Sequence, residues 1–220
     1  DVAAAAGVST ATVSNYINRT KPVSAHTEQR IKEAITTLNY TPNLSARSLK
    51  SNQYNDVGVI LPNLNDSYYA QIFQGIELAF QNTNYFLNLS FSYDIPDIER
   101  NIVHGLLSKN ICGLILITCQ PDDWRFYYDH FTSRDKPLVL IDRFINHLDT
   151  IFVSFDNRST LFHIIKSMLS QGKRDIYLFT GPETFHCENE CIRGYQEAHL
   201  SMDVPFDRRR ITCASLNKED

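Results

Sequence analysis

Two short helices joined by a tight turn are predicted for the first eighteen residues, DVAAAAGVSTATVSNYIN. The run of alanines makes a first helix thin enough to pack closely, and Gly7 can adopt the positive φ that ends a helix. Val8 is placed to fill the corner between the helices, and Ser9 is a residue type that caps helix N-termini. The pattern therefore predicts a helix-turn-helix, and no other feature of the chain constrains the fold as strongly.

The second of these helices has two different faces. Val13, Tyr16 and Ile17 recur at helical spacing and are expected to face inward. The positions left on the outer face are small or polar: Thr10, Ala11, Ser14, Asn15 and Asn18. Contact with base edges in the DNA major groove requires such a face. Taken alone, the opening is also compatible with an ordinary helical hairpin.

A third helix and a short fourth one are expected next. Ser24 is a suitable N-cap for a helix that runs to about Asn39. Its apolar stripe consists of Ile31, Ala34, Ile35 and Leu38. Pro42 suits the first position of a further short helix over residues 43–50, and residues 51–55 form a polar linker.

From Val57 onward, short apolar runs alternate with helical stretches. The strand-like runs are VGVILP, FLNLSFS, GLILIT, PLVLID and IFVSF, with helices expected over residues 69–82 and 97–109. A second unit of the same kind begins near Asp156, with a helix to about Gln171, the strand IYLFTG, a helix around residues 191–200 and the strand RITCAS. This alternation predicts a parallel sheet with helices on both faces.

Charge is distributed unevenly along the chain. Residues 1–53 hold six basic and three acidic side chains, and the remainder holds 15 basic and 22 acidic. A basic small domain on an acidic body fits a DNA-binding protein, although a solvated helical surface would give the same balance. No apolar run approaches the roughly 20 residues that cross a bilayer, so we expect a cytoplasmic protein without membrane contact. The five cysteines are odd in number and are expected to be reduced thiols.

Two motifs together resemble a known family. The run AAGVSTATVSNYIN, followed by NYTPNLSARSL, resembles the DNA-binding headpiece and hinge of the LacI/GalR family of bacterial transcription regulators. The runs VGVILPNLNDSYYAQIFQGIE, CGLILI, PLVLIDR and FTGPE fall in order where that family has its strands and pocket loops.

The resemblance implies a small all-α helix-turn-helix headpiece and an α/β periplasmic-binding-protein-like body of two lobes. The implied segments are a headpiece over 1–41, a hinge helix and linker over 42–55, an N-terminal lobe over 56–155 and part of a C-terminal lobe over 156–220. The family's body normally continues further and Asp1 is not an initiator methionine, so we expect a chain truncated at both ends with an incomplete second lobe.

In the family, the start and the middle of the second helix touch base edges, and these positions match Thr10, Ala11 and Asn15. A threonine hydroxyl can donate or accept, an alanine methyl can meet a thymine methyl, and an asparagine can bind adenine through two hydrogen bonds. The family usually has arginine where Asn15 stands, and a phosphate contact or no contact is the alternative for this residue. The remaining polar positions are expected to contact phosphates: Ser9, Thr12, Ser14 and Asn18.

The hinge residues that match the family are Asn43, Ala46 and Leu49. The resemblance implies that two hinge helices pack together and that Leu49 enters the minor groove as an apolar wedge that bends the duplex. The alternative is that Leu49 anchors the linker to the body. An effector that reorients the lobes would melt the hinge and release the operator.

The resemblance also implies an effector pocket between the lobes. Its expected residues are Asp66, Tyr68, Tyr69, Asp142, Arg143, Asp156 and, after Gly181, Cys191. The family commonly has proline at the position of Ser67 and an effector-binding arginine at that of Cys191. The expected effector is a small molecule of the sugar class, although the missing arginine leaves its identity open.

Two other hypotheses, a metal site and an enzyme active site, have less support. A metal site at His186, Cys187 and Cys191 would need ligands that no second cluster supplies. Carboxylates that could act as acid and base pairs lie beside Pro96 or Pro121, where they are expected to cap helices: Asp94, Asp97, Glu99, Asp122 and Asp123. No nucleophile elbow or phosphate-binding loop accompanies them.

We therefore expect no enzyme activity, cofactor or metal. The expected protein is a homodimeric repressor that binds a palindromic double-stranded DNA operator. A sugar-binding module of the same body fold, without regulatory DNA binding, is the alternative.

Overall fold

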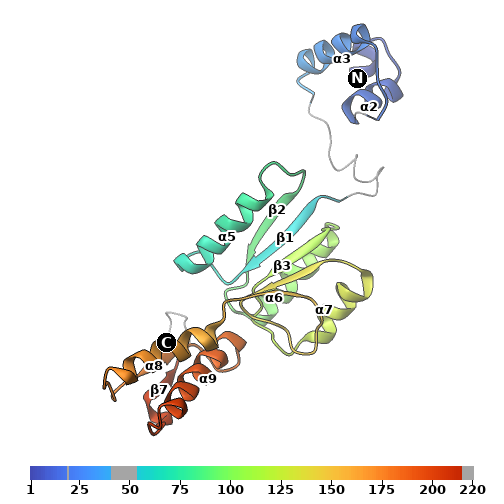
Figure 1. Cartoon of the computed structure of the whole chain (residues 1–220). Helices are drawn as coiled ribbons and strands as arrows, with labels where there is room; N and C mark the ends of the chain where they lie inside the picture. The colour runs from blue at the N-terminus through green and yellow to red at the C-terminus, as the bar shows by residue number, and fades with distance from the viewer. Residues whose placement is uncertain (19, 41–53, 215–220) are drawn as a thin grey trace. The chain divides into compact units, whose positions relative to one another are not determined.

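The computed structural model describes residues 1–18, 20–40 and 54–214, and the chain divides into two compact units, Asp1–Gln53 and Tyr54–Asp220 (Figure 1). The predicted helix at residues 43–50 and the linker after it lie largely outside the described residues. None of the helices within these ranges is long and apolar enough to cross a membrane.

The first unit contains α1 (Val2–Ala5), α2 (Thr10–Asn18) and α3 (Ala25–Thr37). Gly7 has a φ of 56°, which confirms its predicted role in ending the first helix. The hydroxyl of Ser24 accepts a hydrogen bond from the Thr27 N–H, which confirms the predicted N-cap of α3. A small core of Val2, Ala6, Val13, Ile31 and Ala34 holds the three helices together.

The second unit is built on a five-stranded sheet in the order β2-β1-β3-β4-β5, and every pair of neighbours is parallel. The strands are β1 (Asp56–Leu61), β2 (Phe86–Phe91), β3 (Gly113–Leu116), β4 (Leu138–Ile141) and β5 (Ile151–Val153). In the register of the central strands, Val59 lies opposite Leu89 on one side and Ile115 on the other. The predicted parallel sheet is thus confirmed.

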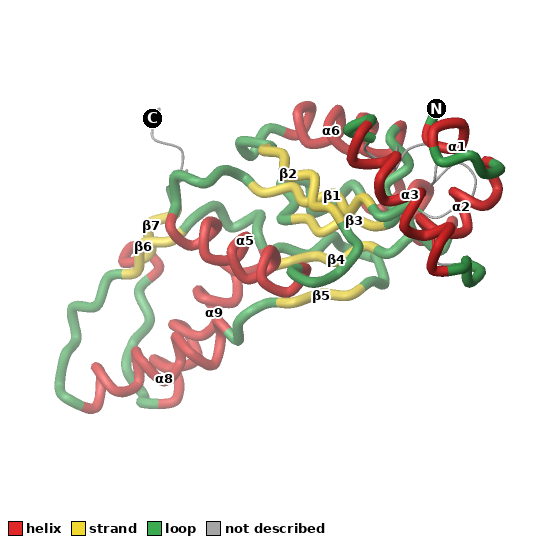
Figure 2. The backbone as a smooth tube through the Cα atoms, turned by 90° about the horizontal axis from the view of Figure 1, so that it is seen from above, coloured by secondary structure: helices red, strands yellow, loops and turns green. Residues whose placement is uncertain are grey.

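Helices cover both faces of this sheet (Figure 2). On one face α5 (Ser67–Phe80) packs over Val59, Leu61 and Ile117. On the other face α6 (Pro96–Ser108) and α7 (Trp124–His130) enclose a core that includes Ile60, Leu116 and Leu140. Alternate residues of β1 therefore point to opposite cores, as the two-residue period of a strand requires.

The rest of the unit, after β5, contains two α-helices and a small second sheet. Its elements are α8 (Asn157–Ser170), β6 (Leu178–Thr180), α9 (His186–Ser201) and β7 (Ile211–Cys213). The short helix η1 (Thr132–Arg134) follows α7, and η2 (Arg208–Arg210) directly precedes β7. Strands β6 and β7 pair in parallel as a separate sheet. The helix expected around residues 191–200 begins earlier, because Phe185 has the extended backbone of an N-cap and Glu188 bonds back to Thr180 and Gly181.

Candidate functional site

The first turn of α2 presents polar groups and contains no acidic residue. Thr10 and Ala11 are exposed there. The Ser9 hydroxyl accepts from the Thr12 N–H at 3.1 Å and shares a 2.9 Å hydrogen bond with the Thr12 hydroxyl, so this pair caps the helix. An anion is favoured at this N-terminal end of α2, because the helix dipole and the N–H groups that remain unpaired there carry partial positive charge.

Ser14 and Asn15 lie one turn further along α2 and are half-buried. The carboxamide oxygen Oδ1 of Asn15 accepts a hydrogen bond of 3.0 Å from the Thr20 hydroxyl. Asn18 ends the helix. The predicted hinge residues Asn43, Ala46 and Leu49 lie outside the described residues.

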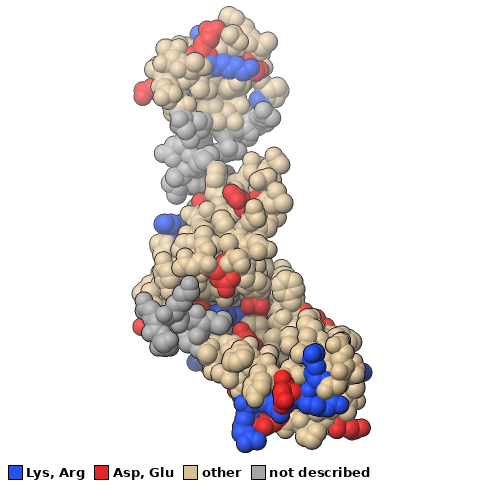
Figure 3. All heavy atoms as spheres, turned by 90° about the vertical axis from the view of Figure 1, so that its left-hand side faces the viewer, with Lys and Arg blue, Asp and Glu red and all other residues tan. Residues whose placement is uncertain are grey.

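Basic side chains at one end of the body pair with acidic ones. In the face that Figure 3 shows, basic and acidic side chains mix at the end of the body that α8, α9 and β7 form. The pairs there include Arg158 with Glu197, Arg208 with Glu183 and Arg210 with Asp175. A surface of mixed sign attracts phosphates weakly, so this end of the body is a poor candidate for a nucleic-acid interface.

The carboxyl ends of the parallel strands bring a polar cluster together. Arg143 follows β4, is 3% exposed, and donates to Asp94 Oδ1 at 2.6 Å and to the Tyr69 hydroxyl at 3.0 Å. Its guanidinium lies 3.8 Å from the ring centroid of Phe185, the N-cap of α9. Because β1 pairs with both β2 and β3, this is the switch point of the sheet, where α/β proteins commonly bind ligands.

Asp142 adjoins Arg143 and is also buried, with a φ of 64°. Burial raises the pKa of its carboxyl above the ordinary value, while a hydrogen bond with Tyr68 opposes that shift. Burial, with Asp142 nearby, also raises the pKa of the Tyr68 hydroxyl. The pKa values of Cys187 and Cys191 are raised to about 12 and about 11, first by burial, so both thiols are protonated at neutral pH.

The predicted pocket residues are therefore placed in two groups. Tyr68, Tyr69, Asp142 and Arg143 meet in the cluster, and Asp142 acts on the pKa of Cys191. Asp66 and Asp156 instead cap helices: their carboxylates accept from the N–H groups of Tyr68 and Ser159 at 2.8 and 2.9 Å.

Two members of the cluster, Asp94 and Phe185, are not predicted from the sequence. Asp94 is predicted only as a carboxylate at a helix start, but it pairs with Arg143. Its position just after a predicted strand was the available signal, because carboxyl ends of parallel strands meet at one edge.

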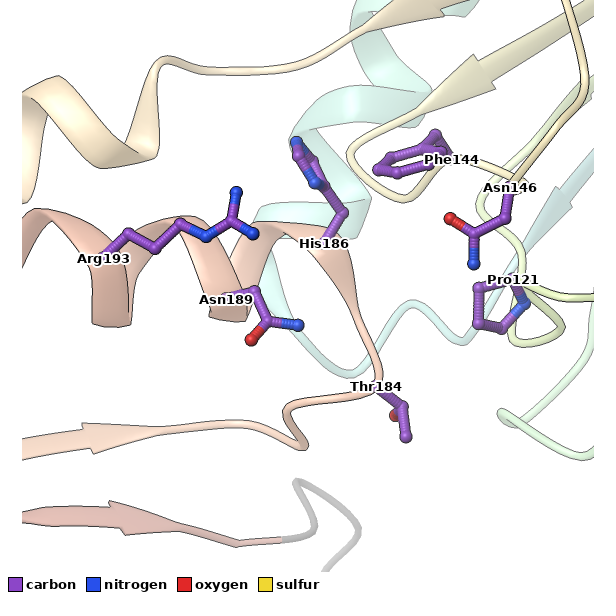
Figure 4. Close-up of a pocket in the computed structure, with 7 residues that line it drawn as sticks. All are labelled: Pro121, Phe144, Asn146, Thr184, His186, Asn189 and Arg193. Carbon is purple, nitrogen blue, oxygen red and sulfur yellow. The ribbon is translucent and has the colours of Figure 1, made fainter. Parts of the chain in front are cut away.

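A cavity of about 210 Å³ lies beside this cluster (Figure 4). Pro121, Phe144 and Asn146 line one side, and the others come from α9 and the loop before it: Thr184, His186, Asn189 and Arg193. The rings of Phe144 and His186 meet edge to face with centroids 4.4 Å apart. Aromatic rings beside amide groups suit a small polar ligand.

Other candidate residues have structural partners. Within the described ranges, no three His, Cys, Asp or Glu side chains gather as metal ligands. Glu99 lies in the first turn of α6, but its carboxylate is fully buried and accepts from the hydroxyls of Thr118 and Tyr127. The capping interpretation is wrong for this carboxylate, because the fold turns it inward.

Comparison with known proteins gives two family matches. Residues 1–43 match the family described as bacterial regulatory proteins, lacI family, and residues 54–219 match periplasmic binding proteins and sugar binding domain of LacI family.

Individual proteins are also similar to the chain. The HTH-type transcriptional repressor PurR of Histophilus somni (strain 129Pt) is 33% identical over 181 residues, which are 82% of this chain and 54% of that protein. The repressor CytR of Escherichia coli (strain K12) is 27% identical over 96% of this chain and 61% of its own length. The chain thus spans about half the length of the curated relatives it matches.

A solved structure shares the fold. The lac repressor dimer bound to operator and the anti-inducer ONPF matches with a TM-score of 0.80 at 24% identity, over 93% of this chain and 62% of that one.

Proposed function

The chain belongs to the LacI family of bacterial regulatory proteins, and from this premise we propose that it is a transcription regulator that represses genes by binding operator DNA. The observation that carries the proposal is the first turn of α2, which is exposed, polar and free of acidic residues on a separate compact unit. The proposed role is regulatory rather than enzymatic, and it is exercised in the cytoplasm.

We propose that Thr10, Ala11 and Asn15 contact base edges, while Ser9, Thr12, Ser14 and Asn18 contact phosphates. The backbone N–H groups at the start of α2 support this assignment, because they favour anions. Asn43, Ala46 and Leu49 are proposed to form the hinge contacts, with Leu49 as a minor-groove wedge. A homodimer would read a palindromic operator, one half-site for each headpiece.

The body is proposed to bind a small effector of the sugar class. The match to a sugar binding domain and the polar cluster at the carboxyl ends of the strands support this proposal. The residues that would contact the effector are those of the polar cluster and its neighbour on α9: Tyr68, Tyr69, Asp142, Arg143 and Cys191. Asp66 and Asp156 would act by placing α5 and α8, since each carboxylate already caps its helix.

Selection from a random duplex library tests the DNA-binding proposal. The 220-residue chain should enrich a motif with two inverted half-sites. A thermal-shift screen of sugars, repeated with Arg143→Met, should show a stabilising sugar whose effect the variant loses. Enrichment of no motif together with a sugar response would favour the alternative, a sugar-binding module without regulatory DNA binding.

A further inference from the structure

Thr20 folds back onto Asn15 just beyond the end of α2. The Thr20 N–H donates to the Asn15 carbonyl oxygen at 3.2 Å, and the Thr20 hydroxyl donates to the Asn15 side-chain oxygen Oδ1 at 3.0 Å. The same residue thus binds both the backbone and the side chain of the residue assigned to base contact. The backbone bond keeps Thr20 close to the carboxamide.

The hydroxyl bond holds the Asn15 carboxamide in place. A carboxamide has an oxygen with two acceptor lone pairs and an NH₂ group with two donors, and rotation by half a turn exchanges them. In the orientation that the structure shows, the Thr20 hydroxyl donates to Oδ1, and this bond restricts rotation of the carboxamide. The NH₂ group and the second lone pair of Oδ1 then stay available to a ligand.

Adenine requires this pair of groups in one order. Its major-groove edge offers an acceptor at N7 and a donor at the N6 amino group, and asparagine binds both at once. A side chain that is already oriented loses less conformational freedom on binding. The reversed carboxamide would set donor against donor and acceptor against acceptor at the same base.

We propose that Thr20 is a specificity-determining positioning residue, which orients the Asn15 carboxamide for adenine without itself touching DNA. The inference rests on the proposed DNA-binding function and deepens it. It assigns to this chain a two-residue reading unit in place of the single arginine that is usual in the family.

The test uses the 220-residue chain and the duplex that the wild-type chain selects from a random library. Thr20→Val removes the hydroxyl at nearly constant shape, and Thr20→Ser keeps it. Thr20→Val should weaken binding to the selected duplex about three- to tenfold and relax the preference at one adenine in each half-site, because one hydrogen bond is lost. Thr20→Ser should bind as the wild type does. Affinity for random duplex and the urea midpoint should be unchanged in both variants.

A double-mutant cycle separates orientation of Asn15 from a direct effect of Thr20. In an Asn15→Ala background, Thr20→Val should have no further effect on binding. An effect of full size in that background would overturn the inference, as would a Thr20→Val chain that selects the wild-type motif with wild-type affinity. A wild-type chain that selects no motif would instead overturn the proposed function, and this inference with it.

Discussion

Glu99 shows how one buried side chain can organise several elements. Its Oε1 accepts from the Thr118 hydroxyl at 2.8 Å and from the Tyr127 hydroxyl at 2.6 Å, and its Oε2 accepts from the Cys119 N–H at 2.7 Å. These donors come from α7 and from the segment that follows β3. The carboxylate therefore joins α6 to two neighbours at the edge of the polar cluster.

Removing one of these donors should destabilise the body. We expect Tyr127→Phe to lower the free energy of unfolding by roughly 1–3 kcal/mol, because a buried carboxylate loses one of its hydrogen-bond donors. Tyr128→Phe is the matched control, since that neighbouring side chain is 45% exposed and should change stability by less than about 0.5 kcal/mol. Urea denaturation of both variants measures the difference. Equal losses would show that the Glu99 contact contributes nothing specific.

Asp142 gives a prediction about pH. Burial raises the pKa of this carboxyl in the folded protein, so the folded state binds its proton more tightly than the unfolded state does. The resulting cost to stability is absent below the ordinary pKa and is fully present above the raised one. Asp142→Asn removes this titration. Relative to wild type, the variant should therefore gain stability as the pH rises from about 4 to 7. Denaturation midpoints at the two pH values measure the change, and a relative loss with rising pH would contradict the assigned direction.

At the scale of elements, α8 and α9 approach closely at Gly194. A Cβ added there would overlap the carbonyl oxygen of Arg158 and lie 3.0 Å from the backbone nitrogen of Phe162. The absence of a side chain at this position therefore sets the distance between the two helices.

Two glycine substitutions test this packing. Gly194→Ala should destabilise the body by about 1–3 kcal/mol, because backbone atoms must move apart. Gly75→Ala in α5 meets nothing within 4 Å and should stabilise it by about 0.5–1 kcal/mol through helix propensity. Calorimetry of both variants is the measurement. A Gly194→Ala protein at least as stable as Gly75→Ala would rule out close packing at this contact.

Local signals predicted the elements well, and contacts distant in sequence escaped prediction. Ser9, Ser24 and the positive φ at Gly7 follow from rules that involve only neighbouring residues, and the structure confirms them. The apolar runs likewise predicted all seven strands of the residues that the structure describes. The contact between Arg143 and Asp94 spans 49 residues and depends on which strands pair, information that a single sequence does not contain.

The same limit applies to the candidate pocket. The resemblance predicts that Asp66 and Asp156 lie in the pocket. In the structure they stand directly before α5 and α8, at the position where aspartate commonly caps a helix. Phe185 carried no signal, because its contact with Arg143 arises only when the segment before α9 folds against the loop after β4.

At the scale of the whole molecule, the two compact units have charges of opposite sign. DNA affinity that comes from phosphate contacts should fall steeply as the salt concentration rises, because salt ions compete with the protein for the phosphates. A dimer with 6–10 such contacts would lose about 10³–10⁵ in affinity between 50 and 200 mM salt. Fluorescence anisotropy with a labelled random duplex follows this change. An affinity independent of salt would contradict an interface built on phosphate contacts.

The ratio of specific to non-specific DNA affinity tests the central proposal most directly. A duplex carrying the selected motif and a shuffled duplex of equal length would compete for the wild-type chain at one fixed salt concentration. The account predicts a preference for the motif of about 10³-fold or more, with Asn15→Ala reducing it by roughly 1–3 kcal/mol. Equal affinity for the two duplexes would contradict the proposal that this chain is a sequence-specific regulator.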